Sequence, residues 1–365
     1  MYESFGNMLL AAADASVLTE DLVVEILSRL PYSPLCRFKC VSKSGLALCS
    51  DPALRRKARQ TLSGFFYSVL TSRQTLNSRH FTNVSGRGRP MVDPSLSFLP
   101  SSCKNIQIID SSNGLLLCGY AKKYDYEYLV CNPATEKWIV LPDTDAMQGM
   151  HTARLCFDPA VSSHFRVFLL VKDKLEVTGV ELYSSKTGAW TYRQSQWGDN
   201  CIVHDAATSV FFNGIMHFTT SGSSVVTVDM ELNTWRKIPT PHPTNSSFIG
   251  LSQGRLFLLR CDYDNDYHLS VWVLEDYGGE KWILKHSASK SELCEPRQLN
   301  SPRSLVLTAI HPERNLIFFT KEHGDIVSYD MDSRIMHTIF SPGPYRTCTY
   351  QPYIPCFLEW LSDGH

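Results

Sequence analysis

Near its N-terminus the chain carries apolar residues at the spacing of an amphipathic helix. In the segment LTEDLVVEILSRLP, Leu22, Ile26 and Leu30 recur every four residues, so they share one stripe of a helix. Thr19 stands where it can cap the first turn, and acidic residues follow it at the positive end of the helix dipole. Pro31 ends the segment, because proline disfavours helical geometry in the residue before it.

Shorter amphipathic runs over 33–41, 42–49 and 52–62 predict further helical pieces. A helical unit of this size forms a poor core by itself, and its apolar stripe needs a partner or a neighbouring domain to cover it. We therefore expect a small helical domain over residues 18–62, preceded by a flexible tail over 1–17.

After residue 64 the pattern changes to short runs rich in β-branched and aromatic residues, separated by Gly, Asn, Pro and Asp, which predicts an all-β region. Two signals recur in it. The first is a turn that precedes an apolar strand: Asn113-Gly114, Ser163-His164, Asn213-Gly214, Gln253-Gly254 and Arg314-Asn315. The second is an aromatic or aliphatic residue that opens a later strand: Trp138, Trp190, Trp235, Trp282 and, more weakly, Ile339.

The four tryptophans lie 52, 45 and 47 residues apart, and each follows its turn by a similar interval. Repeats of about 40–50 residues with four strands each are typical of β-propeller blades. The first repeat predicts strands at 106–111, 115–120, 127–132 and 137–141, and four more copies end near Phe340. A β-sandwich with chance tryptophans is the alternative, but five repeats in constant phase fit one sandwich poorly.

Two strand-like pieces, FFYSVL (65–70) and CFLEWL (356–361), remain at the ends of the β region. A ring of blades has to close without exposed strand edges, so these ends are expected to share one composite blade. The predicted fold class is α+β in two parts: a small helical domain over 18–62 and an all-β propeller of about six blades over 63–365. Seven blades is the alternative.

The composition excludes several classes of protein. Lys and Arg total 35 against 36 acidic residues, so the net charge of −1 gives no global footprint for nucleic acid or membrane. Twelve cysteines occur without C-x-x-C spacing, and many interrupt apolar runs, so we expect reduced thiols, no metal site and no cofactor. No apolar run approaches the roughly 18 residues of a membrane span, and the expected location is the cytoplasm and/or the nucleus.

A propeller enzyme is the alternative class of function. Neither H-E-x-x-H nor a phosphate-binding glycine loop occurs in the chain. His204-Asp205 and His217 are expected to be structural residues of the blades, and the basic runs at 55–57 and 87–89 to be solvated surface. We therefore predict a non-catalytic protein.

The helical segment also carries a known pattern: LTEDLVVEILSRLPYSPLCRFKCVSKSGLALCSDPALRR, residues 18–56, resembles an F-box. Downstream, SFLP (97–100), DSSNGLLLC (110–118) and VCNPATEKWIVLP (130–142) resemble the F-box-associated, kelch-like propeller domain of plant F-box proteins. The chain departs from the usual F-box at Thr19, which replaces a proline, and at Gly45, which replaces a tryptophan. Loss of that apolar anchor weakens adaptor binding unless Leu46 and Leu48 compensate.

The resemblance implies the substrate-recognition subunit of a Skp–cullin–F-box E3 ubiquitin ligase. In such a protein the F-box docks on a Skp-type adaptor, and through it on a cullin–RING ligase, while the propeller binds a target protein whose identity the sequence does not give. The residues implied for adaptor binding are Leu18, Leu22, Ile26, Leu27, Leu30, Pro31, Leu35, Phe38 and Val41. Two alternatives remain: the stripe packs on the propeller instead, or the protein is an F-box scaffold that acts without ubiquitin transfer.

A target-binding face follows from the topology of the blades. Successive connections in a four-stranded blade alternate between the two faces of the ring, so the middle connections of all blades share one face. Two of them, 122–127 and 262–267, are dense in tyrosine with acidic neighbours, and recognition loops are enriched in tyrosine. We predict that Tyr124, Tyr126, Tyr263 and Tyr267 hold the target there and that the acidic neighbours favour a basic segment. The alternative is that these tyrosines lie flat on the blades.

Overall fold

The computed structural model describes residues 19–28, 42–50, 61–70, 79–103, 106–122, 125–144, 152–244, 247–262, 268–293, 305–321, 324–343 and 347–356. The chain divides into two compact units, one formed chiefly by the residues up to Thr61 and the other by most of the residues from Leu62 onward. No described helix is long and apolar enough to cross a membrane.

The N-terminal unit contains helices α2 (Glu20–Ser28) and α4 (Lys43–Ser50). The carbonyl of Thr19 accepts the amide of Val23 at 3.1 Å, which places Thr19 at the predicted N-cap position of α2. Ser42 caps α4, because its hydroxyl accepts the amide of Gly45 at 2.9 Å. The first predicted helix is therefore present over 20–28 and the one expected over 42–49 is present as α4, whereas the piece expected over 33–41 and residues 52–60 of the piece expected over 52–62 lie outside the described residues.

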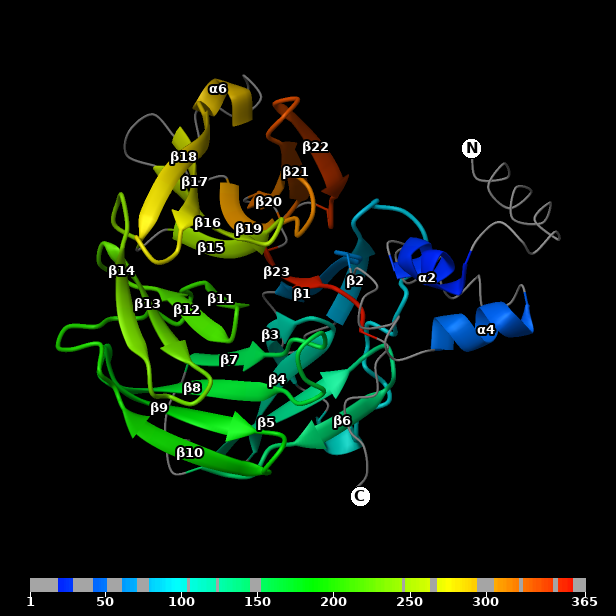
Figure 1. Cartoon of the computed structure of the whole chain (residues 1–365), viewed down its shortest axis with the longest axis horizontal. Helices are drawn as coiled ribbons and strands as arrows, with labels where there is room; N and C mark the ends of the chain where they lie inside the picture. Colours follow the sequence, from blue (N-terminus) through cyan, green and yellow to red (C-terminus); the bar gives the residue numbers. More distant parts are fainter. Residues whose placement is uncertain are drawn as a thin grey trace. The chain divides into compact units, whose positions relative to one another are not determined.

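Five four-stranded antiparallel sheets follow in chain order and form the blades of a propeller (Figure 1). Blade 1 consists of β3 (Gln107–Ser112), β4 (Leu115–Lys122), β5 (Asp125–Asn132) and β6 (Lys137–Val140). Blade 2 consists of β7 (Thr152–Cys156), β8 (Arg166–Asp173), β9 (Glu176–Ser184) and β10 (Ala189–Gln194). Blade 3 consists of β11 (Ser209–Phe212), β12 (Ile215–Thr219), β13 (Ser224–Asp229) and β14 (Trp235–Pro239).

Blade 4 consists of β15 (Ser247–Ser252), β16 (Arg255–Asp262), β17 (His268–Asp276) and β18 (Lys281–Ala288). Blade 5 consists of β19 (Leu305–Ile310), β20 (Leu316–Lys321), β21 (Ile326–Asp330) and β22 (Ile335–Phe340). Short helices lie between sheets, η2 (Ser101–Cys103) before blade 1 and α6 (Lys290–Leu293) after blade 4.

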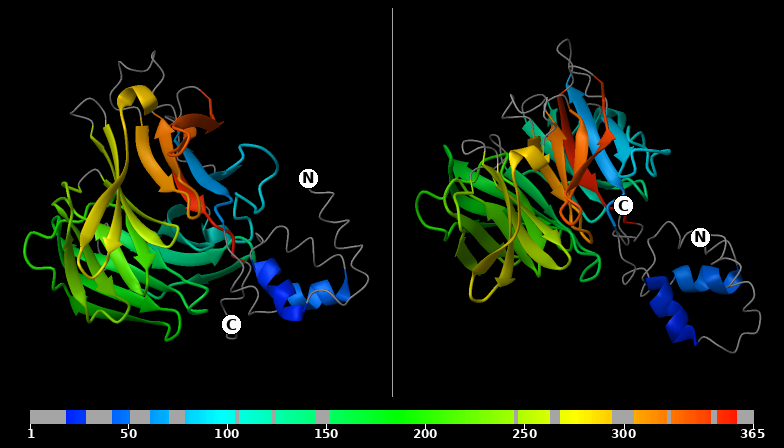
Figure 2. Two further views of the ribbon diagram at one scale, coloured as in Figure 1. Left: turned by 45° about the horizontal axis from the view of Figure 1, so that its top comes forward. Right: turned by 90° about the horizontal axis from the view of Figure 1, so that it is seen from above.

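A sixth blade closes the ring with strands from both ends of the propeller unit. It has the order β2-β1-β23, with β1 (Gly64–Leu70), β2 (Arg79–Asn83) and β23 (Thr347–Tyr353). β1 and β23 lie side by side in Figures 1 and 2, and their register pairs Phe66 with Gln351. Because β23 also contacts β3 and β19, it is the innermost strand of this blade. The predicted composite blade and the count of six blades are confirmed.

The position of the closing strand corrects the sequence prediction. The strand expected from Cys356 onward is wrong at its start, because β23 ends at Tyr353 and Cys356 lies outside any strand; residues 357–361 lie outside the described part of the chain. β23 was missed because it is not an apolar run. Polar residues and a proline interrupt its aromatic residues, and Thr349, Tyr350, Gln351 and Pro352 all line the central cavity described below.

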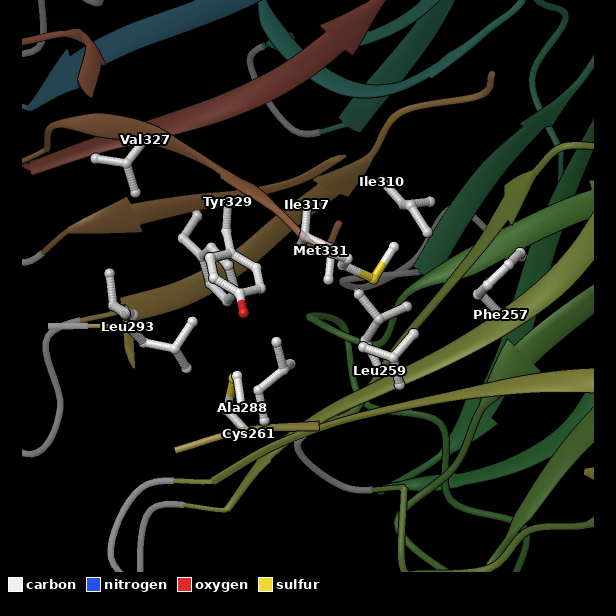
Figure 3. Close-up of a cluster of buried hydrophobic side chains, with 14 of the residues drawn as sticks. Phe257, Leu259, Cys261, Ala288, Leu293, Ile310, Ile317, Val327, Tyr329 and Met331 are labelled. Carbon is white, nitrogen blue, oxygen red and sulfur yellow. The ribbon is translucent and has the colours of Figure 1, made fainter. Parts of the chain in front are cut away.

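The hydrophobic core is distributed between neighbouring blades. One cluster joins blade 4 to blade 5, with Leu259, Ile317 and Tyr329 among its buried members (Figure 3). A corresponding cluster joins blade 1 to blade 2 and contains Leu117 and Val167. Each blade is thus covered by the next, which explains why the central strands of a blade show buried residues on both faces.

The tryptophan signal has a structural cause. Trp138, Trp190, Trp235 and Trp282 stand at the first or second position of the outermost strands β6, β10, β14 and β18. The indole N–H of Trp190 donates to the carbonyl of Pro142 at 2.8 Å, and that of Trp282 to the carbonyl of Pro239 at 2.9 Å. These bonds tie a blade to the end of the preceding one. The prediction that Ile339 opens the last strand of the fifth repeat was wrong, because Ile339 lies near the end of β22, which begins at Ile335.

The turn signal also has a structural cause where the turn contains glycine. Both residues of Asn113-Gly114, Asn213-Gly214 and Gln253-Gly254 have positive φ, as two-residue hairpin turns require. Gly114 has a second constraint: a Cβ built there would lie 2.3 Å from the backbone nitrogen of Cys356, whereas a Cβ at Gly214 would meet nothing within 4 Å. The chain after β23 therefore packs directly on the first hairpin of blade 1.

Candidate functional site

Helix α2 presents the predicted apolar stripe. Leu22 and Ile26 are each 49% exposed, while Leu27 is 3% exposed. On α4, Leu46 is 51% exposed and Leu48 is half-buried. Half-exposed leucine and isoleucine one turn apart form a surface suited to a partner. The other predicted contacts, Leu18, Leu30, Pro31, Leu35, Phe38 and Val41, lie outside the described residues.

The propeller contains a central cavity of about 1040 Å³. Its walls come from β3, β7, β15, β19 and β23 and from the connection that precedes β11, mostly near the starts of these inner strands. A second cavity of about 540 Å³ shares several lining residues with the first, including Phe248, Val306 and Leu307. The starts of the inner strands lie at the face where the middle connections also lie, as Lys321 at the end of β20 shows.

The predicted tyrosine rim is only partly described. Tyr126 lines the central cavity, and its ring lies over Gly119, so that a Cβ at Gly119 would come within 2.4 Å of it. The ring meets Tyr128 edge-on at 5.3 Å, and burial raises the pKa of Tyr126. Tyr126 is thus packed on its blade as part of the cavity wall. Tyr124, Tyr263 and Tyr267 lie outside the described residues, and their role in target binding stays a prediction.

Several charged side chains that no sequence motif predicted lie at the wall of the central cavity. The guanidinium of Arg154 donates to the carbonyls of Ala153, Asp205 and Ala207 at 2.8, 3.0 and 2.6 Å. It therefore fastens blade 2 to the connection that enters blade 3. Burial lowers the pKa of Arg154, although the nearby carboxylates of Asp110 and Asp205 oppose that change.

The two carboxylates of the cavity are held differently. Asp110 accepts the backbone amides of Ser111 and Leu155, the second across the junction of blades 1 and 2, and its burial raises its pKa against the opposing charge of Arg154. Asp205 accepts Lys172 at 2.7 Å and Thr152 at 2.8 Å. The hydrogen bond from Lys172 is the main cause of the lowered pKa of Asp205.

The histidines that an enzyme could use as catalytic residues, His204 and His217, occupy different kinds of position. His217 lies in β12, where Nε2 bonds the hydroxyl of Tyr277 at 2.9 Å and Nδ1 lies 3.1 Å from the carbonyl of Ile215. Its place in a blade is as predicted. His204 and Asp205 instead lie in the connection before β11. Within the described ranges no group of three or more His, Cys, Asp or Glu residues is arranged to hold a metal ion.

One motif was overlooked in the sequence. Residues 250–254, GLSQG, match the G-x-S-x-G spacing of a hydrolase nucleophile, which needs a strand–turn–helix context. Here the segment runs from β15 through a hairpin turn into β16. Ser252 is buried and its hydroxyl donates to the carbonyl of His311 at 2.7 Å, a bond between blades 4 and 5. The serine is therefore a structural residue.

Two buried histidines predict an acid-sensitive fold. Burial lowers the pKa of His217 and of His311 from 6.5 to about 4. The unfolded chain then binds more protons than the folded chain between these values, so stability should fall as the pH drops from 6.5 to 4, by about 3 kcal/mol for each histidine. Urea unfolding followed by tryptophan fluorescence across this range measures the slope.

The matched variants are His217→Gln, which should flatten the slope, and a His204→Gln control at an exposed position, which should leave it unchanged. A free energy of unfolding that stays constant from pH 6.5 to 4 would contradict the assignment.

The cysteines whose side chains are described are buried and are not in disulfide bonds: Cys103, Cys118, Cys131, Cys156, Cys201, Cys261 and Cys356. Burial raises the pKa of Cys201 to about 11, so its thiol stays protonated at neutral pH. We expect titration of the unfolded, non-reduced protein to find all twelve thiols. In the native protein, no more than the five remaining cysteine thiols should react rapidly. Fewer than twelve thiols after unfolding, or stoichiometric zinc in the purified protein, would be the contrary result.

The architecture defines the class of protein: a six-bladed β-propeller preceded by a small helical unit with an exposed apolar stripe. Residues 59–342 match the model of the F-box associated beta propeller domain, and residues 16–57 match that of the F-box domain. The chain belongs to the F-box proteins with an F-box-associated propeller, as the resemblance implied.

Relatives in Arabidopsis thaliana extend over most of the chain. F-box protein At5g07610 is 26% identical over 346 residues, which cover 85% of this chain and 79% of the relative. F-box protein At5g49610 is 25% identical over 356 residues, which cover 89% of this chain and 92% of the relative.

Proposed function

We propose that the protein is the substrate-recognition subunit of a Skp–cullin–F-box ubiquitin ligase. The F-box docks on a Skp-type adaptor, the adaptor connects it to a cullin–RING ligase, and the propeller binds the target protein. The protein is a non-catalytic adaptor that acts in the cytoplasm and/or the nucleus. The observation that carries the proposal is the half-exposed pair Leu22 and Ile26 on α2, inside the segment that matches the F-box domain.

The chemistry of the propeller supports a binding role. Ser252 and His217, whose side chains are of catalytic types, bond backbone carbonyls or a tyrosine within the fold. The central cavity, by contrast, is of the size of ligand sites, roughly 300–1,000 Å³. A rigid ring with a hollow at one face is suited to holding a segment of another protein.

Affinity purification of the tagged chain from plant cells under proteasome inhibition tests the proposal. The expected result is recovery of the Skp-type adaptor, a cullin and target proteins that accumulate when the proteasome is blocked. Adaptor without cullin, with targets whose level the inhibitor does not change, would favour an F-box scaffold that acts without ubiquitin transfer. Recovery of neither adaptor nor cullin would contradict the proposal.

A further inference from the structure

Residues 85–90, SGRGRP, form an arginine loop directly after β2. Since β2 is the outermost strand of the closing blade, the arginine loop lies at the rim of the ring. Arg87 and Arg89 are both exposed, and neither guanidinium has a hydrogen-bond or ion-pair partner among the described residues. The loop therefore presents two positive charges that the described fold does not use.

The charges around the arginine loop do not balance. Residues 79–103 contain three arginines, whereas Asp93 is the single acidic residue in this range, which leaves an excess of two positive charges. The carboxylate of Asp93 is occupied within its own turn, because it accepts the amides of Ser95 at 2.9 Å and Ser97 at 2.8 Å. It is therefore engaged by this turn and does not hold the loop arginines.

The backbone of the arginine loop is fixed by a side chain of β2. Nδ2 of Asn83 donates to the carbonyls of Arg87 and Arg89 at 2.7 and 3.3 Å, so a single nitrogen ties the two arginines together. Gly88 between them has φ of +88°, and a Cβ there would lie 3.5 Å from the same nitrogen. The carbonyls of both arginines are thus turned toward β2, while the amides of Gly88 and Arg89 have no acceptor in the described part of the chain.

The arginine loop also packs on the neighbouring blade 5. Gly86 has φ of +67°, and a Cβ there would lie 2.1 Å from the carbonyl oxygen of Ile339 in β22. The sequence of β22 is IMHTIF, so this strand brings no carboxylate to the loop. Because the loop is held by two blades, its backbone has little freedom left to lose when a ligand binds.

We propose that the arginine loop docks an acidic segment of the target protein. A guanidinium matches a carboxylate in a bidentate pair, and two such pairs would balance the local excess of charge. Arg87 and Arg89 stand one residue apart, with Cα atoms at most about 7 Å from each other, so one short segment reaches both. This inference rests on the proposed function, because it names a class of target segment. It concerns a different surface from the tyrosine-dense middle connections, for which a basic segment is predicted.

The test is selection of a random peptide library, displayed on phage, against the full-length chain held on its Skp-type adaptor. We expect the enriched peptides to carry two or more Asp or Glu residues. Synthetic copies of them should bind Arg87→Gln and Arg89→Gln about fivefold more weakly each, the upper end of what one exposed ion pair contributes. Asn83→Ala keeps both charges but releases the loop carbonyls, and it should also weaken binding, which charge attraction alone would not explain.

The matched control is Arg193→Gln, since Arg193 is an exposed arginine of β10 in blade 2. This variant loses the same charge and should bind the peptides as tightly as the unmodified chain. Enriched peptides without acidic residues, normal binding by any of the three loop variants, or equal weakening by Arg193→Gln would overturn the inference. No enrichment by a chain that binds its adaptor would do the same. Failure of the adaptor to hold the chain would instead count against the proposed function.

Discussion

Replacement of Ile26 by Asp is expected to weaken binding of the Skp-type adaptor strongly. Ile26 is 49% exposed on α2, so the new carboxylate lies in water in the free protein and does not disturb the helix. In the complex it would be an uncompensated charge in an apolar interface, and the loss should exceed about 2 kcal/mol, or roughly thirtyfold in the dissociation constant. Titration calorimetry with the purified adaptor measures this loss.

The control for added charge is Leu175→Asp. Leu175 is 59% exposed in the connection between β8 and β9 of the propeller, so it receives a carboxylate at an equally accessible apolar position outside the F-box. Its affinity for the adaptor should equal that of the unmodified chain. If Ile26→Asp binds the adaptor normally while its propeller remains folded, α2 is not the docking surface.

Replacement of Gly114 by Ala is expected to weaken the closure of the ring. Gly114 has φ of +92°, and its new Cβ would lie 2.3 Å from the nitrogen and from the Cβ of Cys356. Positive-φ strain of about 1 kcal/mol and overpacking of about 1–3 kcal/mol should together lower the free energy of unfolding by about 3 kcal/mol. Asn132 holds the same segment through the carbonyl of Cys356 at 2.8 Å, so the segment has little freedom to move away.

The matched variant is Gly214→Ala in the equivalent Asn-Gly turn of blade 3. Its φ of +77° imposes a comparable strain, but nothing lies within 4 Å of the new Cβ. Urea unfolding of both variants should therefore separate them, with Gly214→Ala losing only about 1 kcal/mol. Equal losses in the two variants would show that contact with the closing segment contributes nothing.

The repeated part of the fold was predictable because its signals arise from local requirements. Asn-Gly is preferred where two consecutive residues need positive φ, as at Asn113-Gly114. Trp190 and Trp282 recur in phase because each indole bonds the end of the preceding blade. The F-box helix α2 was predictable for a similar reason, since its apolar period and its N-cap are both short-range features.

The closing strand and the central cavity were not predictable from short-range patterns. β23, with the sequence TCTYQPY, mixes polar residues and a proline with its tyrosines where it lines the cavity, so it lacks the apolar run used to find strands. Asp110 and Arg154 stand 44 positions apart, and only the packing of blade 2 against blade 1 brings them to one wall. No periodicity within a blade indicates which residues from different blades meet at the axis.

Assembly from purified components is the direct test of whether this F-box protein binds a Skp-type adaptor through α2. The chain and the adaptor are mixed at equal concentration and separated by size-exclusion chromatography with light scattering. We expect a single complex with the mass of one copy of each protein, and no such complex with Ile26→Asp. Separate elution of the unmodified chain and the adaptor, with the chain shown to be folded, would contradict it.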